Sequence, residues 1–328
     1  MKAILHYRAG PILRHRLAEN PPEGWTVEVI DETDVDQFAR SLPEADVLLH
    51  VLQPINRAQM ERAPRLKLIQ KIGVGVDTID LAAAEDLGIG VANMPGTNSQ
   101  AVAELAIGLM LAVLRQVSAL DRETRRGKGW SLPPERLERS GEIAGRTVGF
   151  IGFGEVPRRM APVLAAFGAR MIFHDPQAQP AFGASRLELN ALLAEADIVT
   201  LHAPLVEATR GLIRAETLAR MKDGAVLINT ARGGLVDEAA LFAALTSGRL
   251  LGAGLDVFAQ EPVRADHPLL KLPNVVVLPH VAWLTPETIA RSLGVAFENA
   301  RRAISGEKLL HEIRPVRRGA VAAAFANG

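Results

Sequence analysis

Residues 147–168, TVGFIGFGEVPRRMAPVLAAFG, decide the fold. They hold a short apolar run, a glycine pair at Gly152 and Gly154, and a helix-length stretch that ends at Gly168. Strand, tight turn and helix in this order are typical of a unit whose turn binds the pyrophosphate of a dinucleotide. Gly152 permits the turn, and Gly154 removes a side chain so that backbone N–H groups can approach the phosphates.

The third position of this glycine fingerprint departs from the usual pattern. Pro157 stands where Gly or Ala normally lets the helix pack closely on the strand, although proline is tolerated in a helix's first turn. Asp175 supports the fingerprint, because it ends the next predicted strand roughly 20 residues after Gly154 and would accept hydrogen bonds from the adenosine ribose. The alternative is that Asp175 only starts a turn before Pro176. An acidic residue here favours NAD over NADP.

Short apolar runs alternate with helix-length amphipathic stretches along the chain. This alternation predicts parallel sheets covered by helices. The predicted strands form two series, residues 3–7, 25–30, 46–51, 66–72 and 90–93, and then 147–152, 171–174, 198–202, 225–229, 252–257 and 275–278. We therefore expect an α/β protein with two doubly wound parallel-sheet lobes.

Two long helices indicate how the lobes are connected. The apolar stretch at residues 98–115 predicts a helix long enough to bridge two lobes, and a last helix is expected at about 286–304. We predict a flavodoxin-like substrate domain, residues 1–97 and 286–328, into which a Rossmann cofactor domain, residues 98–285, is inserted. From Arg317 onward the sequence has no clear pattern, and we expect poor order there.

The composition excludes several classes of function. Lys plus Arg and Asp plus Glu both number 37, so no net charge attracts nucleic acid or an anionic membrane. The absence of cysteine excludes disulfides, thiolate metal sites and a cysteine nucleophile, and we predict no metal site. No signal peptide and no run of about 18 apolar residues is found, so we expect a cytoplasmic protein without a membrane span.

Polar residues follow three strands of the second series. Arg232 follows the strand AVLIN, Glu261 follows the next strand, and His280 follows the last. Ligands bind beyond the carboxyl ends of parallel strands, where an arginine fork can hold a carboxylate and a histidine can exchange a proton. Each residue alone is more often structural than catalytic. The three strand ends together predict a site.

A series of ordered motifs extends over nearly the whole chain. They are KIGVGVDTIDL (71–81), NMPGTNSQAVAELAIGLML (93–111), GFGEV (152–156), LHAPL (201–205), NTARGGLVDEAAL (229–241), LDVFAQEP (255–262) and PHVAWLTPET (279–288). This series resembles the D-isomer-specific 2-hydroxyacid dehydrogenase family, which includes glyoxylate and hydroxypyruvate reductases and 3-phosphoglycerate dehydrogenases.

The resemblance implies hydride transfer between NAD(H) and the 2-position of a small 2-hydroxy or 2-keto acid. It implies that Arg232 anchors the substrate and that His280, paired with Glu261, exchanges the proton. It also implies that the backbone at Val74 and Gly75 binds the substrate carboxylate. The implied cofactor contacts are Thr97, Gly152, Gly154, Glu155, Val156, Asp175, His202, Pro204, Thr230, Ala231 and Asp256, the last near the nicotinamide amide.

The family also implies a homodimer formed through the cofactor lobe. Trp130 stands where relatives often have a tryptophan on a dimer arm, although a core tryptophan is as good an interpretation. Trp283 follows the histidine where small residues are common, so it either narrows the substrate pocket or packs in the core. Lys71, Arg57 and Gln53 are candidate contacts for the substrate's side chain, and each has a surface alternative.

Other functions of the same fold rank lower. Formate dehydrogenases have Gln where this chain has Glu261, and phosphite dehydrogenases have Lys where it has Val74. An alternative from another class is a dinucleotide-sensing corepressor, because C-terminal binding proteins keep similar site residues. The absence of long disordered extensions argues against that alternative.

Overall fold

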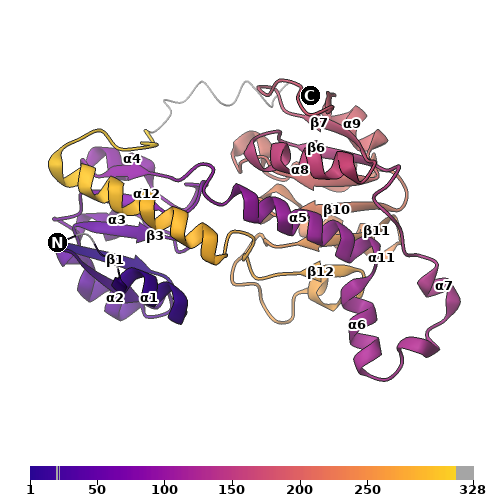
Figure 1. The fold of residues 1–328 in the computed structure, drawn as a ribbon, viewed down its shortest axis with the longest axis horizontal. Helices are drawn as coiled ribbons and strands as arrows, with labels where there is room; N and C mark the ends of the chain where they lie inside the picture. Colours follow the sequence, from indigo (N-terminus) through magenta and orange to yellow (C-terminus); the bar gives the residue numbers. More distant parts are fainter. Residues whose placement is uncertain (20, 22, 315–328) are drawn as a thin grey trace. The chain divides into compact units, whose positions relative to one another are not determined.

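The computed structural model describes residues 1–19, 21 and 23–314, which divide into two compact units. Unit 1 holds Met1–Asn98 and the described residues from Trp283 onward, and unit 2 holds Ser99–Ala282 (Figure 1). The chain returns to unit 1 at residue 283 rather than 286, because Trp283 is buried in the core of unit 1 with its ring 5.7 Å from that of Tyr7. The tail beyond Arg317, expected to be poorly ordered, lies outside the described residues.

Unit 1 is a parallel sheet with helices on both faces. Its strand order is β2-β1-β3-β4-β5, with β1 Lys2–His6, β2 Thr26–Ile30, β3 Val47–His50, β4 Leu68–Lys71 and β5 Gly90–Ala92. Its helices are α1 Pro11–Glu19, α2 Val35–Ser41, η1 Leu42–Glu44, α3 Arg57–Glu61, α4 Leu81–Asp86 and α12 Pro286–Ser305. Neighbouring strand residues enter different core clusters: Ile4 packs with α2 to α4, and Leu5 packs with α1 and α12. The last helix is therefore part of the first unit (Figure 1).

Unit 2 repeats this plan with seven parallel strands. Their order is β12-β11-β10-β9-β6-β7-β8, with β6 Thr147–Ile151, β7 Arg170–His174, β8 Ser185–Arg186, β9 Ile198–Leu201, β10 Ala225–Asn229, β11 Leu250–Leu255 and β12 Val275–Val277. Helices α5 Ser99–Leu114 and α8 Glu155–Ala166 cover one face, and α9 Leu189–Glu195, α10 Ala215–Leu218 and α11 Glu238–Thr246 cover the other. Two doubly wound parallel sheets confirm the predicted fold class.

The strands observed in unit 1 are mostly shorter than the predicted ones. The predicted strand 66–72 includes Ile72, which still donates its N–H to His50 but lies beyond the end of β4. The short strand β8 was not predicted, because its two residues are exposed and polar and form no apolar run. Helix boundaries are closer to prediction: α12 begins at Pro286, after Thr285 caps the N–H of Thr288.

An arm follows α5 in unit 2. It spans residues 117–139, with α6 Val117–Arg125, η2 Gly129–Ser131 and α7 Pro134–Leu137, and it extends away from the sheet (Figure 1). Trp130, on this arm, is 90% exposed, so it is not a core tryptophan of this chain. Within the described residues no single helix is long and apolar enough to cross a membrane. Helices α5 and α6 reach that length and apolar composition only when they are taken together, and they are bent by 61° relative to each other. Most of α5 is packed in the core.

Candidate active site

The glycine turn after β6 is fixed by a close approach between two backbone segments. Gly152 has a φ of 88°, and a Cβ at this residue would lie 2.7 Å from the carbonyl carbon of His202. Any side chain here would clash with main-chain atoms. The contact brings the end of β6 against the end of β9, where the strand order reverses. Ligands of open α/β sheets bind at such a point.

Gly154 leaves the beginning of α8 open. It is the N-cap of this twelve-residue helix, no side chain caps the helix, and a Cβ at Gly154 would have no atom within 4 Å. The N–H groups of Glu155 and Val156 have no acceptor within the helix. Pro157 is buried in the same turn and lacks an N–H group, so the departure from the fingerprint costs no hydrogen bond. The turn and helix fit a bound pyrophosphate.

Asp175 holds the glycine turn as well as a turn of its own. Its Oδ2 accepts the N–H of Phe153 at 2.8 Å, and its Oδ1 accepts the N–H groups of Gln177 at 2.9 Å and Ala178 at 3.1 Å. The interpretation as a turn residue is therefore correct in part. The bond to Phe153 also ties the carboxylate to the turn that the sequence assigns to the pyrophosphate.

Sequence reasoning missed a cation beside Asp175. Arg186 lies on β8, and its Nη2 donates to the backbone carbonyl of Asp175 at 2.6 Å. The loop after Asp175 supplies no cation, as its sequence indicates, but the neighbouring strand does. Because β8 has only two residues, no sequence pattern pointed to this contact.

His280 and Glu261 form a hydrogen-bonded pair, with Nδ1 of the imidazole 2.6 Å from Oε2 of the carboxylate. Oε1 of Glu261 accepts the N–H of Phe258 at 2.9 Å. Burial alone would raise the pKa of Glu261, but the hydrogen bond and charge of His280, the Phe258 N–H and the charge of Arg232 lower it. The ionised carboxylate only accepts, so Nδ1 donates to it. The Nε2 atom of His280 has no hydrogen-bond partner among the described residues.

A second carboxylate fixes the backbone of His280. Asp256, buried at the end of β11, accepts the N–H groups of Val281 and Ala282 at 2.9 Å each, and its carbonyl accepts the N–H of His280 at 2.8 Å. His280 has a φ of 57°, a conformation that non-glycine residues rarely adopt. Sequence reasoning assigned Asp256 to the nicotinamide amide. In the structure its carboxylate orients the histidine loop, and its contact with the nicotinamide amide stays a prediction.

Arg232 is brought to this pair by Gly233. A Cβ at Gly233 would lie 1.9 Å from the carbonyl carbon of Phe258, so the loop after β10 packs directly on the turn that carries Glu261. Nη1 of Arg232 donates to the carbonyl of Ala231 at 2.8 Å. Three residues predicted from separate strand ends thus gather at one edge of the sheet.

Replacing Gly233 by alanine is expected to destabilise unit 2. Because the added methyl group meets main-chain atoms, the two loops must separate, at a cost of about 1–3 kcal/mol or more. Thermal unfolding of parent and variant measures this loss. Gly294→Ala is the matched control, since Gly294 lies on an exposed part of α12 with no atom within 4 Å of the new Cβ. An unfolding midpoint for Gly233→Ala equal to that of the parent would contradict the close approach.

The other predicted cofactor residues in unit 2 follow β9 and β10. Burial lowers the pKa of His202 to about 3, and its Nε2 lies 2.9 Å from the Thr200 hydroxyl. Pro204 is exposed, and Ala231 donates its N–H to the Asn229 side chain. The hydroxyl of Thr230 is buried and has no hydrogen-bond partner in the part of the chain described.

In unit 1, the loop after β4 presents open backbone groups. The carbonyl of Val74 accepts the Asn93 side chain at 2.8 Å, and that of Gly73 accepts the N–H of Met94 at 2.9 Å, so the loop is tethered. The N–H groups of Val74 and Gly75 have no acceptor among the described residues. Thr97, also in this unit, accepts a bond from the Arg291 side chain through its carbonyl.

The three candidate contacts for the substrate's side chain have different surroundings. Lys71 is buried, with Nζ bound to the carbonyl of Val51 and 3.5 Å from Nδ1 of His50. Arg57 forms ion pairs with Asp86 and Glu61. Gln53 is half-buried, and its carbonyl lies 2.7 Å from Nε2 of His50. Burial and the Lys71 ammonium lower the pKa of His50 to about 3.

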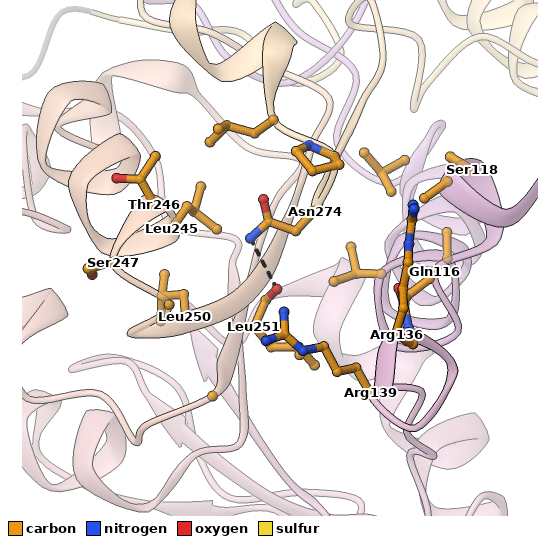
Figure 2. Close-up of a pocket in the computed structure, with 18 of the residues that line it drawn as sticks. Gln116, Ser118, Arg136, Arg139, Leu245, Thr246, Ser247, Leu250, Leu251 and Asn274 are labelled. Carbon is orange, nitrogen blue, oxygen red and sulfur yellow. Dashed lines mark hydrogen bonds between the residues drawn. The ribbon is translucent and has the colours of Figure 1, made fainter. Parts of the chain in front are cut away.

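A cavity of about 1040 Å³ in unit 2 is separate from this site. It lies where β10 and β11 begin, whereas the candidate site lies where the strands end. Arg136 and Arg139 of the arm line one side, and Thr246 and Ser247, at the end of α11, line another (Figure 2). The catalytic candidates do not line this cavity.

These features define an α/β protein of the dinucleotide-binding class: parallel strands, the glycine turn, and a carboxylate–imidazole pair at one edge of the sheet. Residues 107–282 match the family described as "D-isomer specific 2-hydroxyacid dehydrogenase, NAD binding domain". The chain belongs to the D-isomer specific 2-hydroxyacid dehydrogenase family. The resemblance of its motifs to this family is thereby confirmed.

Individual relatives cover the chain to different extents. It is 42% identical to the D-3-phosphoglycerate dehydrogenase of Mycobacterium bovis, over 87% of this chain and 54% of that protein. It is 38% identical to the hydroxypyruvate reductase of Thermotoga maritima, over 81% of this chain and 87% of that protein. A similar fold is found in the crystal structure of the NAD-dependent formate dehydrogenase from Staphylococcus aureus in complex with NAD. The two chains are 29% identical with a TM-score of 0.86, and the match covers 96% of this chain and 99% of that chain. The chain spans about half the length of the phosphoglycerate dehydrogenases it matches.

Proposed function

We propose that the protein is an NAD-dependent oxidoreductase that transfers a hydride between the cofactor and the 2-position of a small 2-hydroxy or 2-keto acid. The observation that carries this proposal is the His280–Glu261 pair, with Arg232 on the adjoining loop. Family membership supports it, as do relatives named as hydroxypyruvate reductase and D-3-phosphoglycerate dehydrogenase.

Each group of the site has a task in this reaction. The nicotinamide, when bound, supplies or accepts the hydride. In reduction, the carbonyl oxygen of the keto acid gains an electron pair as C2 receives the hydride, and Nε2 of His280 gives that oxygen a proton. The imidazole that remains is neutral and stays bound to Glu261. Arg232 would bind the carboxylate and polarise the carbonyl, and the backbone N–H groups of Val74 and Gly75 would hold the carboxylate.

The turn and helix that follow β6 would hold the cofactor. The open first turn of α8 fits the pyrophosphate, and Asp175 fits the adenosine ribose. The unpartnered hydroxyl of Thr230 is a further polar group suited to the cofactor. Thr97, His202, Pro204, Ala231 and Asp256 complete the proposed set of contacts.

Turnover of a panel of 2-keto acids with NADH tests the proposed function. Glyoxylate, hydroxypyruvate and 3-phosphohydroxypyruvate separate the reductase types from the phosphoglycerate dehydrogenase type. We expect saturable NADH oxidation with at least one of them. Binding of NADH without turnover of any 2-keto acid would instead favour a dinucleotide sensor.

The partners proposed are the substrate and a second copy of the chain. Trp130 is 90% exposed on the arm, and Arg136 and Arg139 of the same arm line the cavity of Figure 2. An apolar residue so exposed on a projecting segment suits a homodimer interface. Equal numbers of acidic and basic residues support neither a nucleic-acid nor a membrane partner, and we propose a cytoplasmic location.

Asp175→Ala is expected to narrow the preference for NADH over NADPH by roughly tenfold or more, because a carboxylate repels the 2′-phosphate that only NADPH carries. Arg186, 2.6 Å from the Asp175 carbonyl, would then attract that phosphate. The ratio of kcat/KM for the two cofactors measures the effect. In the double variant Asp175→Ala/Arg186→Ala, part of the gain with NADPH should be lost. Comparable kcat/KM for both cofactors in the parent would contradict the role of Asp175.

A further inference from the structure

A second carboxylate–imidazole pair lies behind the turn that carries Glu261. Nε2 of His267 is 3.2 Å from Oε2 of Glu238, and Oε1 of Glu238 accepts the N–H of Ala259 at 2.8 Å. The side chains of Glu238 and His267 are only 20% and 22% exposed. Glu238 is the first residue of α11, and His267 directly precedes η5, Pro268–Lys271, so three separate segments meet at this turn.

The turn is held at three points. Phe258 donates its N–H to Glu261 itself, and Ala259 donates its N–H to Glu238. The backbone of Gly233 packs against the same two residues so closely that no Cβ fits between them. Of these three contacts, only the bond to Glu238 links the turn to a side chain outside it. The bond to Glu238 therefore ties the turn that carries Glu261 to the beginning of α11.

The His267 ring differs from the His280 ring in its hydrogen-bond surroundings. Its Nδ1 is buried and has no hydrogen-bond partner among the described residues, and its ring packs edge-on against Phe258 at 5.8 Å. A hydrogen on Nδ1 would have no acceptor, whereas Nε2 faces the carboxylate of Glu238, so Nε2 is the atom that donates. The pair therefore keeps a fixed hydrogen-bond direction, whereas His280 has an unoccupied Nε2.

We propose that Glu238 and His267 are positioning residues that hold Glu261 against His280 and so set the pH range in which the enzyme reduces its substrate. The proposal rests on the proposed function. The charged groups around His280 are Glu261 and Arg232, at the ends of neighbouring strands, and Asp256 below its backbone. His267 faces Glu238 and the exposed Asp266. Among the described residues Glu238 has no contact with His280, so it can act on His280 only through the turn that carries Glu261.

The experiment measures the protonation of His280 in two ways, in parent, Glu238→Ala and Glu238→Gln. One is the pH profile of kcat/KM for keto-acid reduction, and the other is the NMR titration of histidine ring carbons without cofactor. The His280 signal is assigned by its loss in His280→Asn. In Glu238→Ala the turn loses its anchor, so both midpoints should move to lower pH, by about half a unit. Glu238→Gln keeps one oxygen for the N–H of Ala259 but has none left for Nε2 of His267, so its midpoints should move in the same direction by a smaller amount.

A double-variant cycle separates positioning from a direct effect. If Glu238 acts through Glu261, then Glu238→Ala/Glu261→Gln should have the midpoint of Glu261→Gln alone. Additive shifts, or an unmoved midpoint in folded Glu238→Ala, would overturn the proposal. Should Glu238→Ala fail to fold, His267→Phe removes the N–H donor, keeps a ring against Phe258, and should move the midpoint in the same direction.

The control is Glu216→Ala, which removes an exposed carboxylate on α10 that pairs with Arg214. Its midpoints should equal those of the parent. If the parent reduces no 2-keto acid with NADH, the proposed function fails, but the NMR titration still tests the positioning. If the parent is active and neither midpoint moves in Glu238→Ala, only the positioning is wrong.

Discussion

Arg232→Ala is expected to lower kcat/KM for 2-keto acids by roughly 30-fold or more and to leave the Kd of NADH nearly unchanged. A charge-assisted bidentate bond to the substrate is lost, and removing such a bond costs about 2 kcal/mol or more in the transition state. The arginine also lowers the pKa of Glu261, so its removal weakens the carboxylate that supports His280. Both effects act on the chemical step, and neither acts on the cofactor.

Steady-state kinetics and NADH binding, measured on the same preparations, test this expectation. Arg232→Lys keeps the charge but not the planar fork, so it should recover only part of the lost activity. Arg214→Ala removes an exposed arginine that pairs with Glu216 on the surface and should have the parent's kcat/KM. Turnover by Arg232→Ala close to that of the parent would remove this residue from the mechanism.

The fold was predictable because its signals are local. Each βαβ unit has an apolar strand of a few residues followed by a helix-length stretch, and the strands of both units were found within a few residues of their ends. The exception is β8, whose two exposed residues, Ser185 and Arg186, pair with β7 without any apolar pattern. Because both residues of β8 are exposed, the spacing of apolar residues in the sequence gives no sign of this strand.

Arg232, Glu261 and His280 were predictable as candidates because the carboxyl ends of parallel strands converge. The residues that hold these three side chains in place were not predictable from the sequence. The carboxylate of Asp256 holds the backbone of the His280 loop, a contact that the resemblance does not indicate, and its contact with the cofactor stays a prediction. In the sequence, Glu238 is only one residue of the motif at 229–241, and no separate role is predicted for it. Its bond to Ala259 joins residues far apart in the sequence, and no local pattern reports such a contact.

For several side chains the sequence left two interpretations open, and the contacts in the structure decide between them. Trp283 is buried in the core of unit 1, which favours the packing interpretation over a role in narrowing the substrate pocket. Arg57 forms ion pairs with neighbours that the sequence alone could not identify. Lys71 is buried rather than at the surface, with its ammonium bound to a backbone carbonyl. The contacts of the cofactor and the substrate carboxylate stay predictions.

Glu261→Gln is expected to move the pH profiles of both reaction directions to lower pH, by about one unit. Keto-acid reduction needs a proton on His280, and hydroxy-acid oxidation needs Nε2 to be free of one, so the two profiles run in opposite directions. The lowered pKa of Glu261 keeps its carboxylate ionised at neutral pH, and this negative charge stabilises the protonated imidazole. Without the charge, the imidazole gives up its proton at lower pH.

The reductive profile should therefore fall earlier as pH rises, and oxidation should remain active further into acid. Activity at the optimum should also decrease, because a Gln side chain has one oxygen where Glu261 accepts two donors, the N–H of Phe258 and Nδ1 of His280. The measurement is kcat/KM against pH for each direction, in parent and variant, with Glu216→Gln as the surface control. The fitted midpoints are assigned to the hydrogen-bonded pair and not to either residue alone. Profiles that stay in place, or move to higher pH, would show that Glu261 does not support the proton on His280.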